Sequence, residues 1–280
     1  MVRIITDSAA DFEPFELEKQ KITCVPMGVA LGGEEYKENV NLSKDQFFAL
    51  LASTGDTPKS SQPSPEVLMN LFAEAKAAGE EALYISLSSA LSGTYQTAVM
   101  TREDAEYDGA YVFDSRNATG GQRLIVEYAV RLRDAGKNAE EIIAALETIR
   151  DKIVLFACID TLEYLYRGGR ISQTVYKLGT MAQVKPIIRV SEEGAIEVPA
   201  KAMGMRKGMD QLVKKLEVQK PSADHRIYVM YTADRTIGRT LAQKLSAMGY
   251  EIPEEQIVQV GAAIGSHIGP NACGVVYVAE

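Results

Sequence analysis

The 280-residue chain carries 30 lysines and arginines against 38 aspartates and glutamates, so its formal net charge is −8. Hydrophobic residues make up 46% and charged residues 24% of the chain, the composition of an ordinary soluble globular protein. The acidic balance excludes non-specific nucleic-acid binding, which needs many basic residues to displace counterions from phosphates. The three cysteines, Cys24, Cys158 and Cys273, lie far apart without a C-x-x-C pair, which excludes a disulfide framework and the usual zinc and iron–sulfur spacings.

The apolar segments are short. Residues Met1–Ser8 turn polar after a few apolar positions, which predicts a strand and not a signal peptide. The longest apolar run elsewhere, Ile153–Ile159, is far shorter than the roughly 20 residues that span a bilayer. Together with the cysteine pattern, which fits a reducing compartment, this predicts a soluble cytoplasmic protein.

Strands and helices alternate in the first part of the chain. Short runs rich in β-branched residues predict strands, and amphipathic segments with apolar residues at helical spacing predict helices. The predicted strands are Val2–Thr6, Ala82–Ser86, Ala110–Phe113 and Ile153–Ile159, and the predicted helices are Pro65–Ala78, Leu124–Leu132 and Ala139–Ile149. This alternation predicts a parallel sheet that is covered by helices on both faces.

The pattern changes after Arg170. A helical segment at Ile171–Gln183 precedes a predicted strand at Pro186–Val190, and the turn residues Ser191–Gly194 predict a hairpin. Two strand–helix pairs follow, and a last strand ends the chain; their ranges are Ile227–Met248, Ile257–Ile264 and Val275–Val278. This second part is typical of a smaller α+β unit.

We therefore expect an α/β fold with two domains. Residues 1–165 form an N-terminal α/β domain with a mainly parallel sheet, and residues 166–280 form a smaller C-terminal α+β domain. The length of the chain favours two domains over one. No Gly/Ser-rich or Pro-rich linker separates the halves, so we expect them to pack closely, with a ligand in the crevice between them.

Ligands of open parallel sheets bind beyond the carboxyl ends of the strands, and three predicted strand ends carry small polar residues. These are Thr6–Ser8, Ser86–Ser89 and Asp114–Ser115. The same residues fit helix capping, in which a side-chain oxygen accepts hydrogen bonds from free backbone N–H groups. Asp11 fits capping as well. We favour capping for Asp7, Ser8, Asp114 and Ser115.

Two hydroxyl-rich segments are stronger candidates for ligand contact. Ser92 and Gly93 follow a predicted buried strand and open a helix, where backbone donors and a hydroxyl can face an anion. The segment Pro58–Pro65 presents Ser60 and Ser61 between prolines that stiffen it. Both segments also fit ordinary turns.

Arg170 and the two histidines complete the candidate set. Arg170 follows the double glycine Gly168-Gly169, and its planar guanidinium suits a carboxylate or a phosphate, although an ion pair bracing the turn fits equally. His225 follows a polar turn, which indicates a surface position. His267 lies in the sequence Gly265-Ser266-His267-Ile268-Gly269-Pro270, which predicts a glycine-rich loop and favours a site residue.

Familiar catalytic and nucleotide-binding motifs are absent. A hydrolase nucleophile elbow needs glycine two residues either side of the serine, but Ala90 and Thr94 flank Ser92. No P-loop or G-x-G-x-x-G motif follows a predicted strand. Gly120-Gly121 alone is weak evidence for a phosphate-binding turn, and two histidines leave little material for a metal site. We expect no cofactor and no metal.

As a set, these motifs resemble the DegV family of bacterial proteins, and they occur in family order over nearly the whole chain. The matching segments are Thr6–Ser8, Pro58–Pro65, Ser88–Tyr95, Asp114–Ser115, Leu162–Ile171, Lys185–Ile187 and His267–Pro270. The resemblance implies a two-domain α/β protein that binds one long-chain fatty acid between its domains. It also implies a non-catalytic role in phospholipid synthesis, in which the carboxylate is presented to a separate ATP-dependent fatty acid kinase that makes an acyl-phosphate.

The resemblance also implies the residues of the site. By position, the carboxylate contacts come from Ser60, Ser61, Ser92 with Gly93, and His267, with Arg170 close by. Ser60 stands where the family usually has threonine, a change that keeps the hydroxyl. The stretch Lys201–Lys207 is less basic and richer in methionine than the family pattern, which bears on the docking surface.

Charge and methionine distribution add two expectations. Five cations and one acid between Lys201 and Lys215 form a local positive patch, which predicts either docking to the kinase or a membrane surface, or a solvated helix face. Five methionines are flexible apolar fillers for a lipid tunnel or for an ordinary core: Met181, Met203, Met205, Met209 and Met230. Two other functions stay open, a small hydrolase or acyl transferase using Ser92 with His267, and a phosphate- or nucleotide-binding module.

Overall fold

A computed structural model describes residues 1–179 and 183–280. Its first sheet contains four parallel strands in the order β2-β1-β6-β7; the parallel sheet was predicted with β1, β6 and β7, whereas β2 was not predicted. The strands are β1 (Val2–Asp7), β2 (Ile22–Val25), β6 (Glu81–Ser86) and β7 (Ala110–Asp114). The 3-10 turn η1 (Ser8–Ala10) and helix α1 (Pro14–Gln20) connect β1 to β2.

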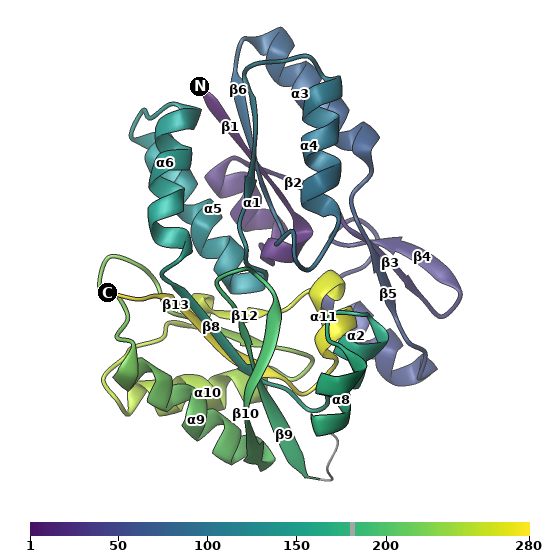
Figure 1. The fold of residues 1–280 in the computed structure, drawn as a ribbon, viewed down its shortest axis with the longest axis vertical. Helices are drawn as coiled ribbons and strands as arrows, with labels where there is room; N and C mark the ends of the chain where they lie inside the picture. The colour runs from purple at the N-terminus through teal and green to yellow at the C-terminus, as the bar shows by residue number, and fades with distance from the viewer. Residues whose placement is uncertain (180–182) are drawn as a thin grey trace.

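Helices cover both faces of this sheet (Figure 1). Helices α3 (Pro65–Ala78) and α4 (Thr94–Asp104) lie on one face, where Phe72 packs against Ile5 and Tyr84. Helices α5 (Thr119–Asp134) and α6 (Ala139–Arg150) cover the other face, where Ile125 and Ile142 belong to a second buried cluster. The apolar side chains of β1 and β6 alternate between the two clusters, which makes the strands apolar throughout.

A small antiparallel sheet, which the sequence analysis did not predict, is inserted between β2 and α3. It has the order β4-β3-β5 and contains β3 (Gly28–Leu31), β4 (Glu34–Lys37) and β5 (Lys59–Ser61), with helix α2 (Lys44–Thr54) between β4 and β5. Gly32 and Gly33 form the β3–β4 turn with φ of 64° and 81°, backbone angles that suit glycine. This sheet carries Ser60 and Ser61 toward the second half of the chain.

The second large sheet has six strands in the order β10-β9-β8-β13-β11-β12. These are β8 (Ile153–Cys158), β9 (Val184–Val190), β10 (Ile196–Met203), β11 (Tyr228–Tyr231), β12 (Ile257–Gln259) and β13 (Cys273–Val278). The pairs are antiparallel except β11 with β12, and β9 and β10 form the predicted hairpin.

Strand β8 corrects the predicted grouping of the strands. The sequence analysis placed Ile153–Ile159 with the N-terminal strands, but β8 pairs with β13 and β9, which contain residues far along the chain. An apolar strand has no local mark of its partners, because pairing depends on the whole chain. The large sheets therefore divide the chain between α6 and β8, and the domains 1–165 and 166–280 remain a prediction.

The two faces of the six-stranded sheet have different neighbours. Helices α9 (Gly204–Val218) and α10 (Arg235–Ser246) pack on one face, where Leu212 and Leu241 are buried. The other face, which includes Leu155 and Met230, is turned toward Leu124 of α5. Helix α5 therefore lies between the two large sheets. No helix in the described ranges is long and apolar enough to cross a membrane.

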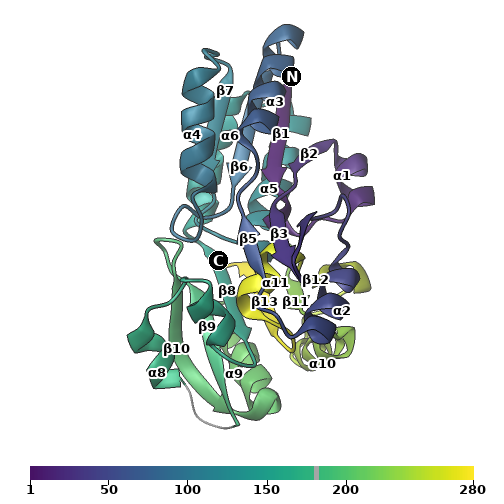
Figure 2. The same cartoon turned by 90° about the vertical axis from the view of Figure 1, so that its right-hand side faces the viewer.

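Four short elements remain in the described part of the chain. They are α7 (Glu163–Arg167), α8 (Gln173–Gly179), α11 (Ala262–Ile268) and the 3-10 turn η2 (Glu254–Gln256). The end of the helix predicted at Ile171–Gln183 falls partly on residues 180–182, outside the described residues. Figure 2 shows α11 beside β3 and β5, with which it is in contact.

His267 lies in the last turn of α11 and not in a loop, which corrects the prediction. The prediction rested on Gly265 and Gly269, but the two glycines have separate roles. A Cβ on Gly265 would lie 2.8 Å from Cε1 of Phe47, so this glycine allows α11 to approach α2 closely. Gly269, with φ of 71°, ends the helix.

Candidate functional site

The centre of the candidate site is a hydrogen bond between Ser60 of β5 and His267 of α11. Ser60 Oγ lies 2.7 Å from His267 Nε2, and both side chains line a small cavity, which we call the His267 cavity. Leu87 and Leu91, which follow β6, and Leu165 of α7 form apolar walls. The cavity therefore combines a few polar atoms with a largely apolar surface.

Ser61 does not face this cavity. Successive side chains of a strand point to opposite faces, and Ser61 pairs with Gly28, where a Cβ would lie 2.2 Å from Ser61 Oγ. Ser60 pairs with Val29 and points to His267. The structure thus separates the two serines that the sequence analysis grouped together.

His267 is neutral near pH 7. Burial, followed by the nearby positive charge of Arg170, lowers its pKa from 6.5 to about 4. Its Nδ1 is buried without a hydrogen-bond partner among the described residues, and it faces Gly168, where a Cβ would lie 2.1 Å away. Because an orphaned buried N–H is rarer than an orphaned lone pair, we assign the proton to Nε2.

This tautomer determines what Ser60 offers to the cavity. His267 Nε2–H donates to Ser60 Oγ, so the hydroxyl hydrogen of Ser60 is left to donate to another acceptor. A carboxylate or another oxygen anion in the cavity is such an acceptor. The arrangement presents a hydrogen-bond donor of fixed position without a positively charged imidazole.

Arg170 and Ser92 also line the His267 cavity. Arg170 Nε donates to the carbonyl of Leu91 over 2.9 Å, so the arginine braces the turn before Ser92 through a backbone contact and not through an ion pair. Ser92 Oγ lies 2.8 Å from Thr94 Oγ1 and accepts a hydrogen bond from the backbone N–H of Thr94, the first residue of α4.

Gly93 is exposed and does not line the His267 cavity. A Cβ on this residue would lie 2.9 Å from Gln62 Oε1, so its small size serves the packing of the loop before α3. Of the six residues that the sequence analysis assigned to the site, the structure brings together Ser60, Ser92, Arg170 and His267.

Of the polar strand ends, Asp7 caps the 3-10 turn η1 as predicted. The helix capping predicted for Asp114 and Ser115 is wrong, because α5 begins after Ala118 without a side-chain cap and both side chains bind loop backbone N–H groups instead. Asp7 accepts hydrogen bonds from the backbone N–H groups of Ala9 and Leu87, and Asp114 accepts them from Ser89 and Arg116. Ser8 differs, because its hydroxyl donates to the buried carboxylate of Glu38. This contact joins β1 to the segment after β4, and no sequence motif indicated it.

An almost entirely apolar second cavity, the Met230 cavity, adjoins the first. The two cavities share Ala118, Ile196, Ile264 and Ile268, and each has a volume of about 50 Å³. The Met230 cavity continues between α5 and the six-stranded sheet, past Met230 and Val276. Small-molecule sites usually measure about 300–1,000 Å³, so a long ligand requires the shared side chains to move apart.

A cationic cleft of about 210 Å³ lies at the other end of the Met230 cavity. Leu155 and Val190 line both, and the cleft is also lined by Arg116, Arg150 and Arg189. The apolar path therefore runs from the Ser60–His267 pair to a charged boundary.

Of the candidate methionines among the described residues, only Met230 lines this apolar path. Met205 and Met209 belong to α9 and pack against the far face of the six-stranded sheet, and Met203 is exposed. Met181 lies outside the described residues. Gly120 and Gly121 are buried packing positions, because a Cβ on them would meet Met230 and Asn117.

The positive patch of Lys201–Lys215 lies on β10 and on the outer face of α9. Arg206, Lys207 and Lys214 are exposed, whereas Lys215 lies over the ring of Phe156 at 4.9 Å. The one acid of the patch, Asp210, pairs with Lys244 of α10 over 2.6 Å. Docking of this surface remains a prediction.

These features define an α/β protein with an internal cavity between two sheets, polar at one end and apolar along the rest. The chain belongs to the DegV family: the family model described as "Uncharacterised protein, DegV family" matches residues 1–280. It is 31% identical over 278 residues to the DegV domain-containing protein YteA of Lactococcus lactis, covering 98% of this chain and 96% of that protein. A DegV domain-containing protein of Caldanaerobacter subterraneus is 30% identical over 279 residues, with 99% and 98% covered.

Solved structures of the family have the same fold. A DegV family protein from Thermus thermophilus, described as fatty-acid-binding, superposes with a TM-score of 0.89 at 28% identity, covering 100% of this chain and 99% of that chain. A protein from Eubacterium ventriosum, described as stearic-acid-binding, superposes with a TM-score of 0.88 at 25% identity, covering 99% and 98%.

Proposed function

We propose that this protein binds a single long-chain fatty acid. The carboxylate of the fatty acid lies at Ser60, Ser92 and His267, with Arg170 beside it. The acyl chain extends into the Met230 cavity. The observation that carries the proposal is that the two adjoining cavities share the lining residues Ala118, Ile196, Ile264 and Ile268. A path that is polar at one end and apolar along its length suits an amphiphile with one head group.

The acyl chain supplies most of the binding energy. Burying each CH₂ contributes about 0.8 kcal/mol, so fourteen methylenes contribute roughly 11 kcal/mol before the costs of ordering the chain. The hydroxyls and the imidazole orient the carboxylate. The arginines of the cationic cleft disfavour a longer apolar chain, because an apolar terminus there would desolvate their charges.

We further propose that the bound carboxylate is the substrate of a separate ATP-dependent kinase. A carboxylate oxygen attacks the γ-phosphorus of ATP, the bond to the β-phosphate oxygen breaks, and the products are an acyl-phosphate and ADP. The neutral hydroxyl of Ser60, which His267 orients, supports this role, because it donates to the carboxylate without carrying a positive charge. The positive patch on α9 is a candidate docking surface for the kinase or for a membrane surface.

A Ser/His-dependent hydrolase or acyl transferase is the second candidate, and the 2.7 Å contact of Ser60 with His267 favours it. The predicted pair was Ser92 with His267, whereas the closest serine is Ser60. A pKa of about 4 makes His267 a weak general base at neutral pH. No carboxylate of the described residues bonds to its Nδ1, so no third group stabilises an imidazolium.

Native mass spectrometry of the purified protein tests the lipid proposal. The expected result is a one-to-one adduct with the mass of a C14–C18 fatty acid, either co-purified or after addition of palmitate. An empty protein that hydrolyses an ester and loses this activity on Ser60→Ala overturns it. The kinase proposal is tested by adding a purified bacterial fatty acid kinase and ATP to the palmitate complex and trapping acyl-phosphate with hydroxylamine, with free palmitate as the control.

A further inference from the structure

Two buried carboxylates meet at the N-terminus of α11. Glu38 Oε1 accepts hydrogen bonds from the backbone N–H groups of Ala262 and Ala263, and Asp11 Oδ1 accepts one from Gly261 over 2.8 Å. Glu38 and Asp11 are each 1% exposed. Both side chains come from the first 40 residues, whereas α11 belongs to the second half of the chain.

The second oxygen of each carboxylate accepts a hydrogen bond from a hydroxyl group. Ser8 Oγ donates to Glu38 Oε2 over 2.6 Å, and Thr119 Oγ1 donates to Asp11 Oδ2. Gly261 allows the approach, because a Cβ there would lie 2.0 Å from Glu38 Oε1 and 3.0 Å from Asp11 Oδ1. The contact is directional and leaves no room for a side chain at position 261.

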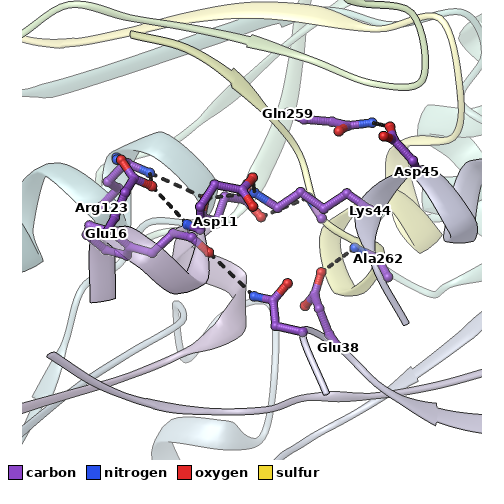
Figure 3. Close-up of polar contacts among 12 residues, drawn as sticks. Asp11, Glu16, Glu38, Lys44, Asp45, Arg123, Gln259 and Ala262 are labelled. Carbon is purple, nitrogen blue, oxygen red and sulfur yellow. Dashed lines mark hydrogen bonds and ion pairs between the residues drawn. The ribbon is translucent and has the colours of Figure 1, made fainter. Parts of the chain in front are cut away.

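Two buried cations fix the turn that carries Asp11 (Figure 3). Lys44 Nζ donates to the Asp11 carbonyl over 2.9 Å, and Arg123 Nη1 donates to the same carbonyl over 3.3 Å. Lys44 also pairs with Glu13, and Arg123 pairs with Glu16. The cations thus bind the backbone of Asp11 and their own acids, and the Asp11 carboxylate is left to α11.

The opposite end and one face of α11 form part of the candidate lipid site. Ala263, Ile264, His267 and Ile268 lie on one helical face and line the His267 cavity. Ile264 and Ile268 also line the Met230 cavity. A displacement of the helix along or about its axis therefore moves His267 and the apolar walls together.

Helix α11 has only seven residues, so its position depends on contacts with the rest of the protein. Such short helices are marginal by themselves, and their first backbone N–H groups need acceptors from outside the helix. Here two carboxylates supply those acceptors, and negative charge at a helix N-terminus is favourable. Ordinary apolar packing would bury α11 but would leave its rotation and its shift along the axis less defined.

We propose that Glu38 and Asp11 are positioning residues of the head-group pocket, which hold the first amides of α11 and thereby place His267 Nε2 against Ser60. The inference deepens the proposed fatty-acid function and rests on it for the effect on binding. The effect on His267 itself is independent of the ligand.

The test compares Glu38→Ala with Glu38→Gln by NMR of the imidazole nitrogens and by the Kd for palmitate. The protein has two histidines, so His225 serves as an internal reference. Glu38→Ala is expected to shift the His267 signals, leave those of His225 in place, and weaken palmitate binding about tenfold. Glu38→Gln keeps one acceptor oxygen for α11, so it is expected to shift His267 less and to bind within threefold of the wild type.

Two further variants separate positioning from general loss of stability. Glu35→Ala changes an exposed acid on β4, three residues before Glu38, and Ile142→Val trims the buried face of α6. Neither is expected to shift His267. Where Glu38→Ala does not fold, Asp11→Asn replaces it and is expected to shift the same signals by a smaller amount.

The outcomes distinguish the two proposals. Folded Glu38→Ala and Asp11→Asn proteins with unchanged His267 signals overturn the positioning role, whatever the affinity. A shifted His267 in a protein whose wild type does not bind palmitate supports positioning and overturns the fatty-acid function. Equal His267 shifts in Glu38→Ala and Ile142→Val assign the effect to general destabilisation and overturn the inference.

Discussion

Ser60 and His267 are 207 residues apart in sequence, and their side chains meet at 2.7 Å. One lies on a three-residue strand of the small sheet, and the other lies on a seven-residue helix near the opposite end of the chain. The pair is the contact at which the N-terminal and C-terminal halves jointly build the polar end of the cavity.

Ser60→Ala is expected to weaken palmitate binding about tenfold, because it removes the hydroxyl that donates to the carboxylate. Ser61→Ala is the matched control: it removes the same group from the opposite face of β5 and is expected to change Kd less than twofold. Isothermal titration of both variants measures this. An equal loss of affinity in the two variants would contradict the placement of Ser60 alone at the carboxylate.

Removing the charge of Arg170 is expected to raise the pKa of His267. Burial is the larger cause of the lowered value of about 4, so Arg170→Gln should bring the pKa up without restoring 6.5. An NMR titration between pH 3 and 8 reads His267 directly, with His225 as the reference. Titration of wild-type His267 near 6.5 would contradict the neutral, buried imidazole.

Gly168→Ala is expected to displace His267. The φ of Gly168, −75°, suits alanine, so the effect is steric. The new Cβ would lie 2.1 Å from His267 Nδ1. Gly169→Ala is the control, because its φ is 76° and nothing lies within 4 Å of the new Cβ. It should lower stability by about 1 kcal/mol without moving the imidazole signals. Palmitate affinity should fall only in Gly168→Ala.

Glu38 makes stability depend on pH in a direction that can be checked. Burial, and then the nearby Asp11, raise its pKa from 4.5 to about 7, so the folded state binds a proton that the unfolded chain releases. Its contribution is fully present below pH 4.5 and is lost as the pH rises through 7. His267 acts in the opposite sense, because its folded pKa is below 6.5 and its contribution is lost as the pH falls through 4.

The difference between wild type and Glu38→Gln isolates the carboxyl from His267. Urea unfolding from pH 4.5 to 8 should show the variant gaining stability relative to wild type as the pH rises, by roughly 1–3 kcal/mol in total. Asp11, whose pKa burial raises to about 6, remains in both proteins. A constant difference across this range would contradict the raised pKa of Glu38.

Met230→Ala is expected to shift the preference of the protein toward longer acyl chains. The change enlarges the apolar cavity, and each additional buried CH₂ contributes about 0.8 kcal/mol. Met209→Ala is the control, since this methionine is 4% exposed like Met230 but lies on α9, against the opposite face of the six-stranded sheet. It should lower stability with the ratio of C14, C16 and C18 affinities unchanged. A changed ratio of these affinities in Met209→Ala would show that the acyl chain does not follow the Met230 cavity.

Local signals in the sequence predicted the N-terminal elements well. The helix predicted at Pro65–Ala78 agrees with α3 at both ends, because Pro65 suits a first turn and Gly79, with φ of 64°, ends the helix. The parallel strands β1, β6 and β7 follow from apolar runs separated by amphipathic helices, whereas β2 was not predicted. The partners of β8 did not follow, because they depend on strands that come after it in sequence.

The site was predicted in its residue types more than in its geometry. That Ser60 and Ser61 face opposite sides depends on how β5 pairs with β3, and a three-residue strand has no pattern that reveals this. Glu38 ends the run Glu34–Glu38, in which the other charged residues are exposed, so its burial has no local signal. Both features arise from contacts between distant segments.

The junction of β5 with α11 has a consequence for synthesis of the protein. The ribosome makes the N-terminal strands first, and the parallel sheet with α3 to α6 can form while the rest of the chain is still being translated. The head-group pocket cannot form at that stage, because His267 is synthesised 207 residues after Ser60. If the proposed function holds, a nascent chain that has not yet reached α11 is therefore unable to hold the fatty-acid head group.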